Sequence, residues 1–376
     1  MTLTGIDVLV RDRFAALAGS RVGLVTNHTG LTLAGQPTID ALFHAPNVAL
    51  TALFGPEHGI RGDFDQPTVA DSTDAVTGLP VHSLYGARTQ PTAEQLEFID
   101  TLVFDIQDIG CRFYTYLSTL DQILLAAETH QKRVVVLDRP NPITGTRTEG
   151  PLADLDKLAF VACHPIPLRH GLTLGEMARL LHAEKKLTCP LEVIECEGWK
   201  RGDWYDATGL LWTNPSPNMR RLSAAALYPG VGLLEFTDVS VGRGTDTPFE
   251  VFGAPYLDAR AFASALNAEN LPGVRFVPTY FTPAASVFAH EHCGGVQILI
   301  TDRESLDAVR VGLTLALVLR CEYQSLWQPE KLMTLLANQV TYDGVVAGKS
   351  YAEIAAGWAR DLAAFEARAL GWRFYE

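Results

Sequence analysis

The feature that most constrains the fold is a succession of short apolar runs, each closed by polar or turn residues and separated by helical patterns. Six runs have the length and branched side chains of buried strands: RVGLVT (21–26), VALTALF (48–54), TLVFDI (101–106), RVVVLD (133–138), KLAFVACH (157–164) and LEVIEC (191–196). Helical patterns fall near 38–44, at 112–131 and at 173–187. Strands alternating with helices imply parallel pairing with right-handed crossovers. We therefore expect an α/β fold with a Rossmann-like, doubly wound, mostly parallel sheet.

The alternation weakens after residue 197, where a segment rich in Pro, Gly and Trp extends to about residue 250. Long segments without a regular pattern are often functional loops. Beyond it the pattern predicts helices at 257–268, 304–320, 329–337 and 349–368, and strands at 275–281 and 294–302. A chain of 376 residues exceeds one ordinary core. We expect a catalytic domain over residues 1–250 and a smaller α+β auxiliary domain over residues 251–376.

Charge and apolar runs exclude several classes of partner. The formal net charge is −13 and no basic stripe is present, so we expect no nucleic-acid partner. No apolar run reaches the ~18–20 residues that a membrane helix needs. The N-terminus lacks the pattern of a secretory signal, and six cysteines without CxxC spacing suit a reduced compartment. We expect a cytoplasmic protein, or a secreted one if a signal has been removed.

Cofactor fingerprints are missing. No strand is followed by GxGxxG or GxxxxGK[ST], and no GxSxG nucleophile elbow occurs. GRGTD (242–246) is Gly-rich but lacks a lysine and a preceding strand, so it is a weak phosphate signal. HEH (290–292), Asp105 and Asp138 are weak metal candidates. We expect neither a cofactor nor a metal.

Polar clusters follow five of the expected strands. They are Asn27-His28, Glu57-His58-Arg61, Asp105 with Asp108, Asp138-Arg139-Asn141, and His164 with Arg169-His170. In a parallel sheet these positions converge on one rim, where ligands of open α/β sheets bind. A single cluster can be structural, as when Glu57 and Arg61 form a loop ion pair. Five on one edge favour a binding pocket.

The pocket is expected to be rich in carboxyl groups and aromatic rings. Its carboxyls are Glu57, Asp105, Asp108 and Glu149, beside Tyr114, Tyr116, Trp199, Trp204 and Trp212. Paired carboxyls with stacking rings suit glycoside hydrolysis, although the tryptophans could equally be core residues. Four arginines, Arg61, Arg112, Arg139 and Arg169, would be surplus for a neutral sugar. They favour a substrate that carries a carboxylate.

A family resemblance rests on motifs that occur in a fixed order along the chain. They are TNHTG (26–30), LFGPEHGIRG (53–62), VFDIQDIGCRFYTYLSTL (103–120), VLDRPNPITG (136–145), EGP (149–151), PIPLRHGLTLGEMA (165–178), SPNMR (216–220), YPGVGLLE (228–235), SVGRGTDTPFEVFGAP (240–255) and CGGVQILITDR (293–303). Together they resemble the exo-acting β-N-acetylmuramidases of the NamZ type. The resemblance implies release of N-acetylmuramic acid (MurNAc) from the non-reducing end of peptidoglycan fragments. The lactyl carboxylate of that sugar would explain the arginines.

The resemblance also implies roles for individual residues. Glu57 is the first choice for a catalytic carboxyl and Glu149 the second, with His58 and Asp105 beside them. The expected substrate-binding residues are Asn27, Arg61, Asp108, Arg112, Tyr114, Tyr116, Arg139, Asn141, Arg169, His170, Asn218 and Arg243. The 2-acetamido group of the sugar could act as the nucleophile, with one polar group orienting it.

Two features keep other interpretations open. LLEFTDVS carries Phe236 and Asp238 where the family more often has Gly and Asn, which leaves subsite preference undecided. The same cleft would also serve a non-catalytic wall-sugar sensor or a metal-dependent amidase or deacetylase.

Overall fold

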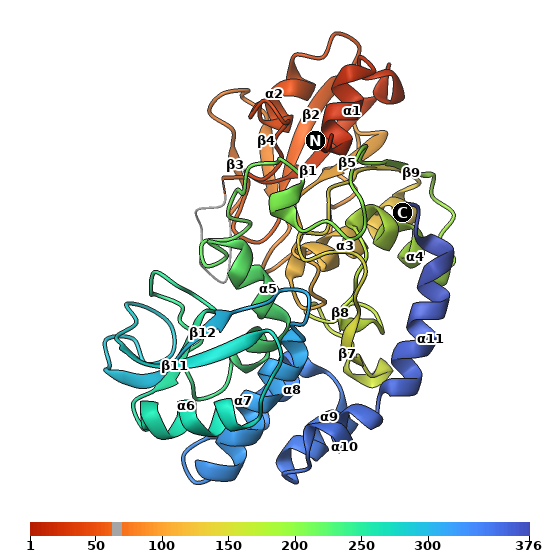
Figure 1. The fold of residues 1–376 in the computed structure, drawn as a ribbon. Coiled ribbons are helices and arrows are strands. Elements are labelled where there is room, and N and C mark those ends of the chain that lie inside the picture. Colours follow the sequence, from red (N-terminus) through yellow and green to blue (C-terminus); the bar gives the residue numbers. More distant parts are fainter. Residues whose placement is uncertain (62–69) are drawn as a thin grey trace.

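The computed structural model describes residues 1–61 and 70–376, and its larger part is built on a seven-stranded sheet (Figure 1). The strand order is β3-β4-β2-β1-β5-β6-β9. The bounds are β1 (Arg21–Thr26), β2 (Ala49–Gly55), β3 (Ser72–Thr73), β4 (Pro80–Ser83), β5 (Thr101–Asp105), β6 (Arg133–Leu137) and β9 (Leu191–Ile194). All pairings are parallel except that of the short edge strand β3. The parallel strands follow one another outward from β1, first through β2 and β4 on one side and then through β5, β6 and β9 on the other. This is the strand order of a Rossmann-like sheet, so the expected fold class is confirmed.

Helices cover both faces of this sheet. They are α1 (Gly5–Arg11), α2 (Thr38–Phe43), α3 (Thr115–His130) and α4 (Leu174–Glu184). Successive strand residues face opposite sides: Val22 and Leu24 pack in one apolar cluster, and Val25 packs in the other. Helix α4 begins where expected, because Thr173 and Glu176 form a capping box.

One expected strand is absent from its place. Residues 157–164 form no strand of the sheet, and a hairpin of β7 (Glu149–Leu152) and β8 (Pro167–Arg169) flanks them instead. A short helix η2 (Leu155–Lys157) precedes a tight turn in which Ala159 pairs with Ala162. Leu158 is 39% exposed whereas Ala162 is fully buried, so this apolar run is only partly covered. An apolar run alone does not distinguish a buried strand from such a segment.

A helix occupies part of the segment that was expected to be a loop. It is α5 (Leu222–Val231), continued by η4 (Gly232–Leu234). Pro229 lies in its last turn and Gly230 next to it, and both read as turn signals in sequence. A Cβ on Gly230 would lie 1.7 Å from the Ala308 carbonyl oxygen. Gly230 is therefore required by the close crossing of two helices.

The partner in that crossing is α7 (Ala308–Glu322) of the smaller domain. This domain has an antiparallel sheet of order β10-β12-β11. Its elements are β10 (Val251–Ala254), α6 (Ala259–Ala268), β11 (Val274–Phe281), β12 (Cys293–Ile300), α7, η5 (Glu330–Leu332), α8 (Met333–Leu336), α9 (Gln339–Val346), α10 (Tyr351–Ala356) and α11 (Ala359–Ala369). The smaller α+β domain is confirmed, while a boundary at residue 250 stays a prediction.

The C-terminal segment returns to the larger domain. Helix α11 runs along one side of the molecule, so that the C-terminus lies beside the Rossmann-like part (Figure 1). After η6 (Leu370–Trp372), the Tyr375 hydroxyl donates to Asp138 Oδ2 at 2.6 Å and accepts from the Cys196 amide at 2.8 Å. The remaining short helices are η1 (Ala15–Leu17) and η3 (Tyr205–Ala207).

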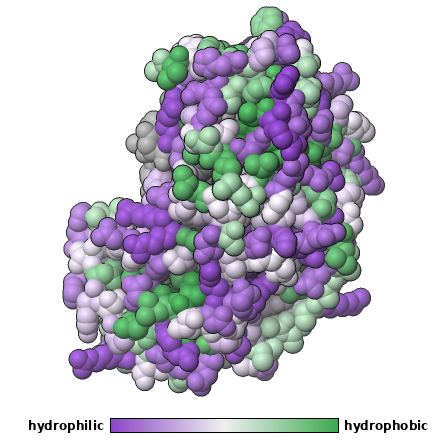
Figure 2. Space-filling view, turned by 45° about the horizontal axis from the view of Figure 1, so that its top comes forward, coloured by the Kyte–Doolittle hydropathy of each residue, from purple (hydrophilic) through white to green (hydrophobic). Residues whose placement is uncertain are grey.

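The surface is mixed in character. On the face seen in Figure 2, hydrophilic and hydrophobic residues are interspersed over both the larger lobe and the smaller lobe. Within residues 1–61 and 70–376, no helix is long and apolar enough to cross a membrane.

Candidate active site

A cavity of about 140 Å³ lies beyond the carboxyl ends of β2, β4 and β5. The larger domain contributes residues that follow these strands, and the segment from 216 to 249 closes the other side. The lining residues are Glu57, His58, Tyr85, Phe113, Tyr114, Thr115, Tyr116, Val161, Ser216, Asn218, Met219, Tyr228, Glu235, Phe236, Arg243, Phe249 and Leu335. The cavity is where the parallel sheet places a ligand site.

Glu57 reaches this cavity through a tight turn after β2. His58 and Gly59 both have left-handed backbone angles, with φ of 69° and 72°. A left-handed histidine is uncommon, and such residues concentrate at functional sites. The Thr115 hydroxyl, on the first residue of α3, donates a hydrogen bond to Glu57 Oε2. The turn presents the carboxyl group and the helix end orients it.

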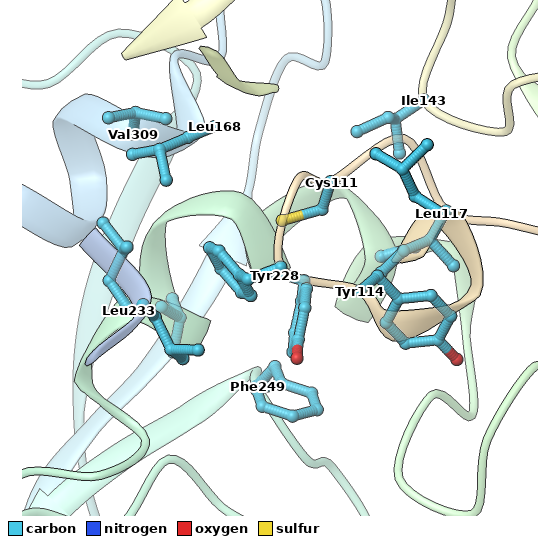
Figure 3. Packing of buried hydrophobic residues seen from close by; sticks show 14 of the residues in the cluster. Cys111, Tyr114, Leu117, Ile143, Leu168, Tyr228, Leu233, Phe249 and Val309 are labelled. Atoms are coloured by element: carbon cyan, nitrogen blue, oxygen red, sulfur yellow. The ribbon is translucent and has the colours of Figure 1, made fainter. Parts of the chain in front are cut away.

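Three buried tyrosines form the wall beside Glu57. Tyr114 and Tyr116 meet edge to face with ring centroids 4.9 Å apart. Tyr228 packs in the same way on Phe249 at 4.7 Å (Figure 3). Burial raises the pKa of Tyr116, to which the Glu57 charge adds, and burial likewise raises the pKa of Tyr228, to which Glu235 adds. All remain neutral phenols that can donate hydrogen bonds.

Arg243 and Glu235 form an ion pair within the cavity wall. Arg243 Nη1 donates to Glu235 Oε1, and the side chains are 26% and 10% exposed. Gly242 and Gly244 flank the arginine with φ of 82° and 80°. A Cβ on Gly244 would lie 2.4 Å from the Ala285 amide nitrogen. The two glycines of GRGTD are therefore required by the backbone on either side of Arg243, and the motif places this arginine in the cavity wall.

Comparison with known proteins decides the family. The family model described as "Exo-beta-N-acetylmuramidase NamZ, N-terminal" matches residues 22–223. The model described as "Exo-beta-N-acetylmuramidase NamZ, C-terminal" matches residues 226–375. The chain belongs to the NamZ family. The resemblance carried by the ordered motifs is thereby confirmed, and with it the expected class of enzyme, a glycoside hydrolase.

NamZ relatives match over most or all of the chain. The peptidoglycan β-N-acetylmuramidase NamZ of Bacillus subtilis (strain 168) is 44% identical over 312 residues, which is 83% of this chain and 75% of that protein. A crystal structure of a DUF1343 family protein from Bacteroides fragilis superposes with a TM-score of 0.88 at 38% identity, covering 100% of this chain and 99% of that one. A second DUF1343 protein from the same organism has a TM-score of 0.80 at 28% identity, with the same coverage.

Six of the residues expected to form the NamZ site line the cavity: Glu57, His58, Tyr114, Tyr116, Asn218 and Arg243. Their roles in catalysis and binding stay predictions. Glu235 was missed, although it ends the quoted motif YPGVGLLE. It follows a helix rather than a strand, so the rule that polar residues collect after strands did not reach it.

Asp105 lies outside the cavity. It is fully buried, and its oxygens accept hydrogen bonds from Arg139 Nε at 2.6 Å, from Arg139 Nη2 at 2.9 Å and from the Thr38 hydroxyl. This ion pair fastens the carboxyl end of β5 to the loop after β6. Neither residue lines the cavity, and the catalytic role expected for Asp105 and the substrate-binding role expected for Arg139 stay predictions.

Glu149 lies where β7 meets the first turn of α7. Its carboxylate pairs with Arg169 and accepts the Ala308 amide at 2.8 Å, at the first turn of α7. A carboxylate is favoured at a helix N-terminus, and here it joins β7 to the smaller domain. Neither Glu149 nor Arg169 lines the cavity, and their expected roles in catalysis and substrate binding stay predictions.

Two further arginines point elsewhere. Arg112 is buried and donates to the carbonyls of Pro151 and Ile166 and to those of Leu335 and Leu336. Arg61 pairs with the buried Asp74 at 2.5 Å. Neither lines the cavity, so substrate binding by these side chains is not supported.

The remaining expected residues hold loops at the sheet rim. Asn27 accepts the Thr29 amide at 2.9 Å, Asp108 accepts the Gly110 amide at 2.7 Å, and Asn141 donates to the Leu172 carbonyl at 3.0 Å. His170 is fully buried, with Nε2 3.8 Å from Asp108. These residues shape the rim without lining the cavity.

The expected stacking tryptophans are likewise not cavity residues. Trp199 packs on Tyr375 and Trp212 on Tyr205, while Trp204 lies beside Arg169 and Arg303. Among the residues that the structure describes, no three His, Cys, Asp or Glu side chains are grouped as metal ligands.

Proposed function

We propose that this protein is an exo-acting β-N-acetylmuramidase that hydrolyses terminal non-reducing MurNAc from peptidoglycan fragments. The observation that carries the proposal is a carboxyl group, Glu57, held by Thr115 in a small cavity that also contains Arg243. The family description and the activity named for the Bacillus subtilis relative support it.

Glu57 is assigned the role of general acid. A positioned carboxylic acid protonates the leaving glycosidic oxygen as the bond to C1 breaks. The barrier is lowered because the leaving sugar then departs as a neutral alcohol rather than as an alkoxide. The neutral Tyr114 and Tyr228 line the same cavity and offer hydroxyl groups to a sugar without adding charge, whereas the Tyr116 hydroxyl donates to the Pro215 carbonyl. His58 and Asn218, also in the lining, are assigned to positioning the substrate.

Arg243 is assigned to the lactyl carboxylate of MurNAc. Of the arginines considered from the sequence, it is the one that lines the cavity. A guanidinium binds carboxylates bidentately through paired N–H groups, which makes Arg243 the cavity residue best suited to the lactyl carboxylate.

We also propose that the enzyme acts in the cytoplasm on imported wall fragments. All six cysteines are unpaired, which suits a reducing compartment. Fractionation of the source cells tests this location, because recovery of the protein only outside the cytoplasmic fraction would contradict it.

The decisive experiment compares 4-nitrophenyl β-MurNAc with 4-nitrophenyl β-GlcNAc. We expect nitrophenol release from the first. On the disaccharide MurNAc-GlcNAc, whose sugar leaving group needs a proton to depart, we expect a loss of at least ~10²-fold in kcat for Glu57→Gln, which keeps the shape of the side chain but removes its proton. Glu195→Gln, in an exposed ion pair with Arg179, is the matched control. Hydrolysis of only the GlcNAc glycoside would refute the substrate, and full activity of folded Glu57→Gln would refute the assignment of the acid.

The exo mode is tested separately with two peptide-free wall fragments, the disaccharide MurNAc-GlcNAc and the trisaccharide GlcNAc-MurNAc-GlcNAc. MurNAc at the non-reducing end should be released, whereas the same sugar capped there by GlcNAc should not be. Equal cleavage of both fragments would show an endo-acting enzyme.

A further inference from the structure

The cavity contains a second carboxyl group beside Glu57. Glu235 is 10% exposed and pairs with Arg243, and both side chains line the same space as Glu57. The charges of Glu235 and Glu57 both help to raise the pKa of the Tyr228 phenol, after the larger effect of burial. Glu57, Glu235 and Tyr228 all line this one cavity.

The Glu235–Arg243 pair presents opposite charges next to each other. MurNAc carries two neighbouring substituents of matching character, an acetamido N–H on C2 and a lactyl carboxylate on O3. A carboxylate recognises the N–H and a guanidinium recognises the carboxylate. The adjacent protein groups are thus complementary to adjacent groups of the sugar.

We propose that Glu235 accepts the acetamido N–H while Arg243 binds the lactyl carboxylate, and that Glu235 thereby orients the acetamido oxygen as the internal nucleophile. This deepens the proposed function and rests on it. The pairing with Arg243 keeps Glu235 in a fixed position, as an orienting group requires.

The reaction then balances in two steps. In the first, the acetamido oxygen forms a bond to C1, the C1–O bond to the leaving sugar breaks, and the leaving oxygen takes the proton of Glu57. The resulting oxazolinium ion donates its N–H to Glu235. In the second, water adds to C1, the electron pair returns to the acetamido oxygen, and the Glu57 carboxylate takes the proton of that water. Two displacements at C1 leave the β configuration unchanged.

Variants of the pair test the division of roles. For Glu235→Gln we expect kcat to fall by ~10²-fold or more with little change in KM, because the charge is needed most when the cationic intermediate forms. For Arg243→Lys we expect KM for the MurNAc glycoside to rise about 10-fold, since bidentate binding is lost. A purely structural role for either residue would lower the melting temperature and affect both kinetic constants alike.

Measurements on the unmodified protein keep the proposal testable if a variant does not fold. Substrates whose N-acetyl group carries one, two or three fluorines have a progressively weaker nucleophilic oxygen, and we expect kcat to fall by ~10²-fold or more along the series. The first-formed sugar, observed by proton NMR, should be the β anomer.

The outcomes separate the two proposals. Hydrolysis of the MurNAc glycoside with an α product, or with rates insensitive to fluorination, would overturn the role of Glu235 while leaving the proposed function intact. An unmodified protein that hydrolyses neither glycoside would overturn both.

Discussion

A single hydroxyl group, that of Thr115, links the fold to the chemistry. It lies at the first residue of α3 and donates to Glu57. Hydrogen bonds to a charged group contribute about 1.5–3 kcal/mol. We therefore expect Thr115→Val to lower kcat on 4-nitrophenyl β-MurNAc by roughly 10-fold or more, whereas Thr115→Ser, which keeps the hydroxyl, should stay close to the unmodified enzyme. Equal rates for the two variants would show that the bond does not position the acid.

Residue identity alone did not separate catalytic from structural charges. The position of Glu57 in the cavity was predictable, because the end of an apolar run and a Gly-Pro turn mark the rim of a parallel sheet. Asp105 also ends an apolar run, and Glu149 was chosen from the EGP motif, yet each pairs with a buried arginine from a distant part of the chain, Arg139 and Arg169. Such pairing depends on tertiary contacts that local patterns do not contain.

The element that best shows how the two domains are joined is α7. Its N-cap Asp307 accepts the Arg310 amide at 2.8 Å and the Tyr351 hydroxyl at 3.2 Å. Burial, and then the nearby Glu149 charge, raise the pKa of Asp307 from 3.8 to about 6. Because this folded-state pKa exceeds the unfolded one, the stability that Asp307 contributes is complete below pH 3.8 and is lost as pH rises through about 6.

Asparagine caps helices about as well as aspartate but cannot ionise. We therefore expect Asp307→Asn to raise the free energy of unfolding by about 1–3 kcal/mol at pH 8 and by far less at pH 4. Urea denaturation at the two pH values measures this difference. Asp258→Asn, at the exposed N-cap of α6, should change stability by only a few tenths of a kcal/mol, and an equal response of both variants would contradict the account.

Element types were predictable where hydrophobic periodicity was strong. The strands β1, β2, β5, β6 and β9 and the helix α3 fall where expected. Helix α5 was missed because Pro229 and Gly230 read as a turn, whereas their reason lies in the packing against α7. Glu235 was not predicted as a cavity residue for the same reason, because its position depends on where this helical segment ends.

On the scale of the whole molecule, Arg112 connects parts that are far apart in sequence. Its guanidinium donates to the Pro151 and Ile166 carbonyls of the larger domain and to the Leu335 and Leu336 carbonyls of α8. Burial lowers its pKa to about 10, which still leaves it charged at neutral pH. Leu335 also lines the cavity, so the same side chain supports the active-site wall.

Replacing Arg112 should weaken the connection between domains. We expect Arg112→Met, which leaves four buried carbonyls without their donor, to lower the free energy of unfolding by at least about 3 kcal/mol and to split one calorimetric transition into two. The control Arg21→Met removes an exposed ion pair with Asp100 and should cost less than about 1 kcal/mol. A single transition with an unchanged midpoint in Arg112→Met would contradict this.

The first and last residues of the described chain both contact the segment 198–208. The Thr2 amide donates to the Thr208 carbonyl at 3.0 Å, and the Arg201 amide donates to the Glu376 carbonyl at 2.8 Å. A Cβ on Gly198 would lie 3.0 Å from the Met1 carbonyl oxygen, while Tyr375 packs on the neighbouring Trp199. The first and last residues of the described chain therefore lie close together. A short peptide could join residue 376 to residue 1, and the chain could be reopened at an exposed turn to give a circular permutant with the same sheet order.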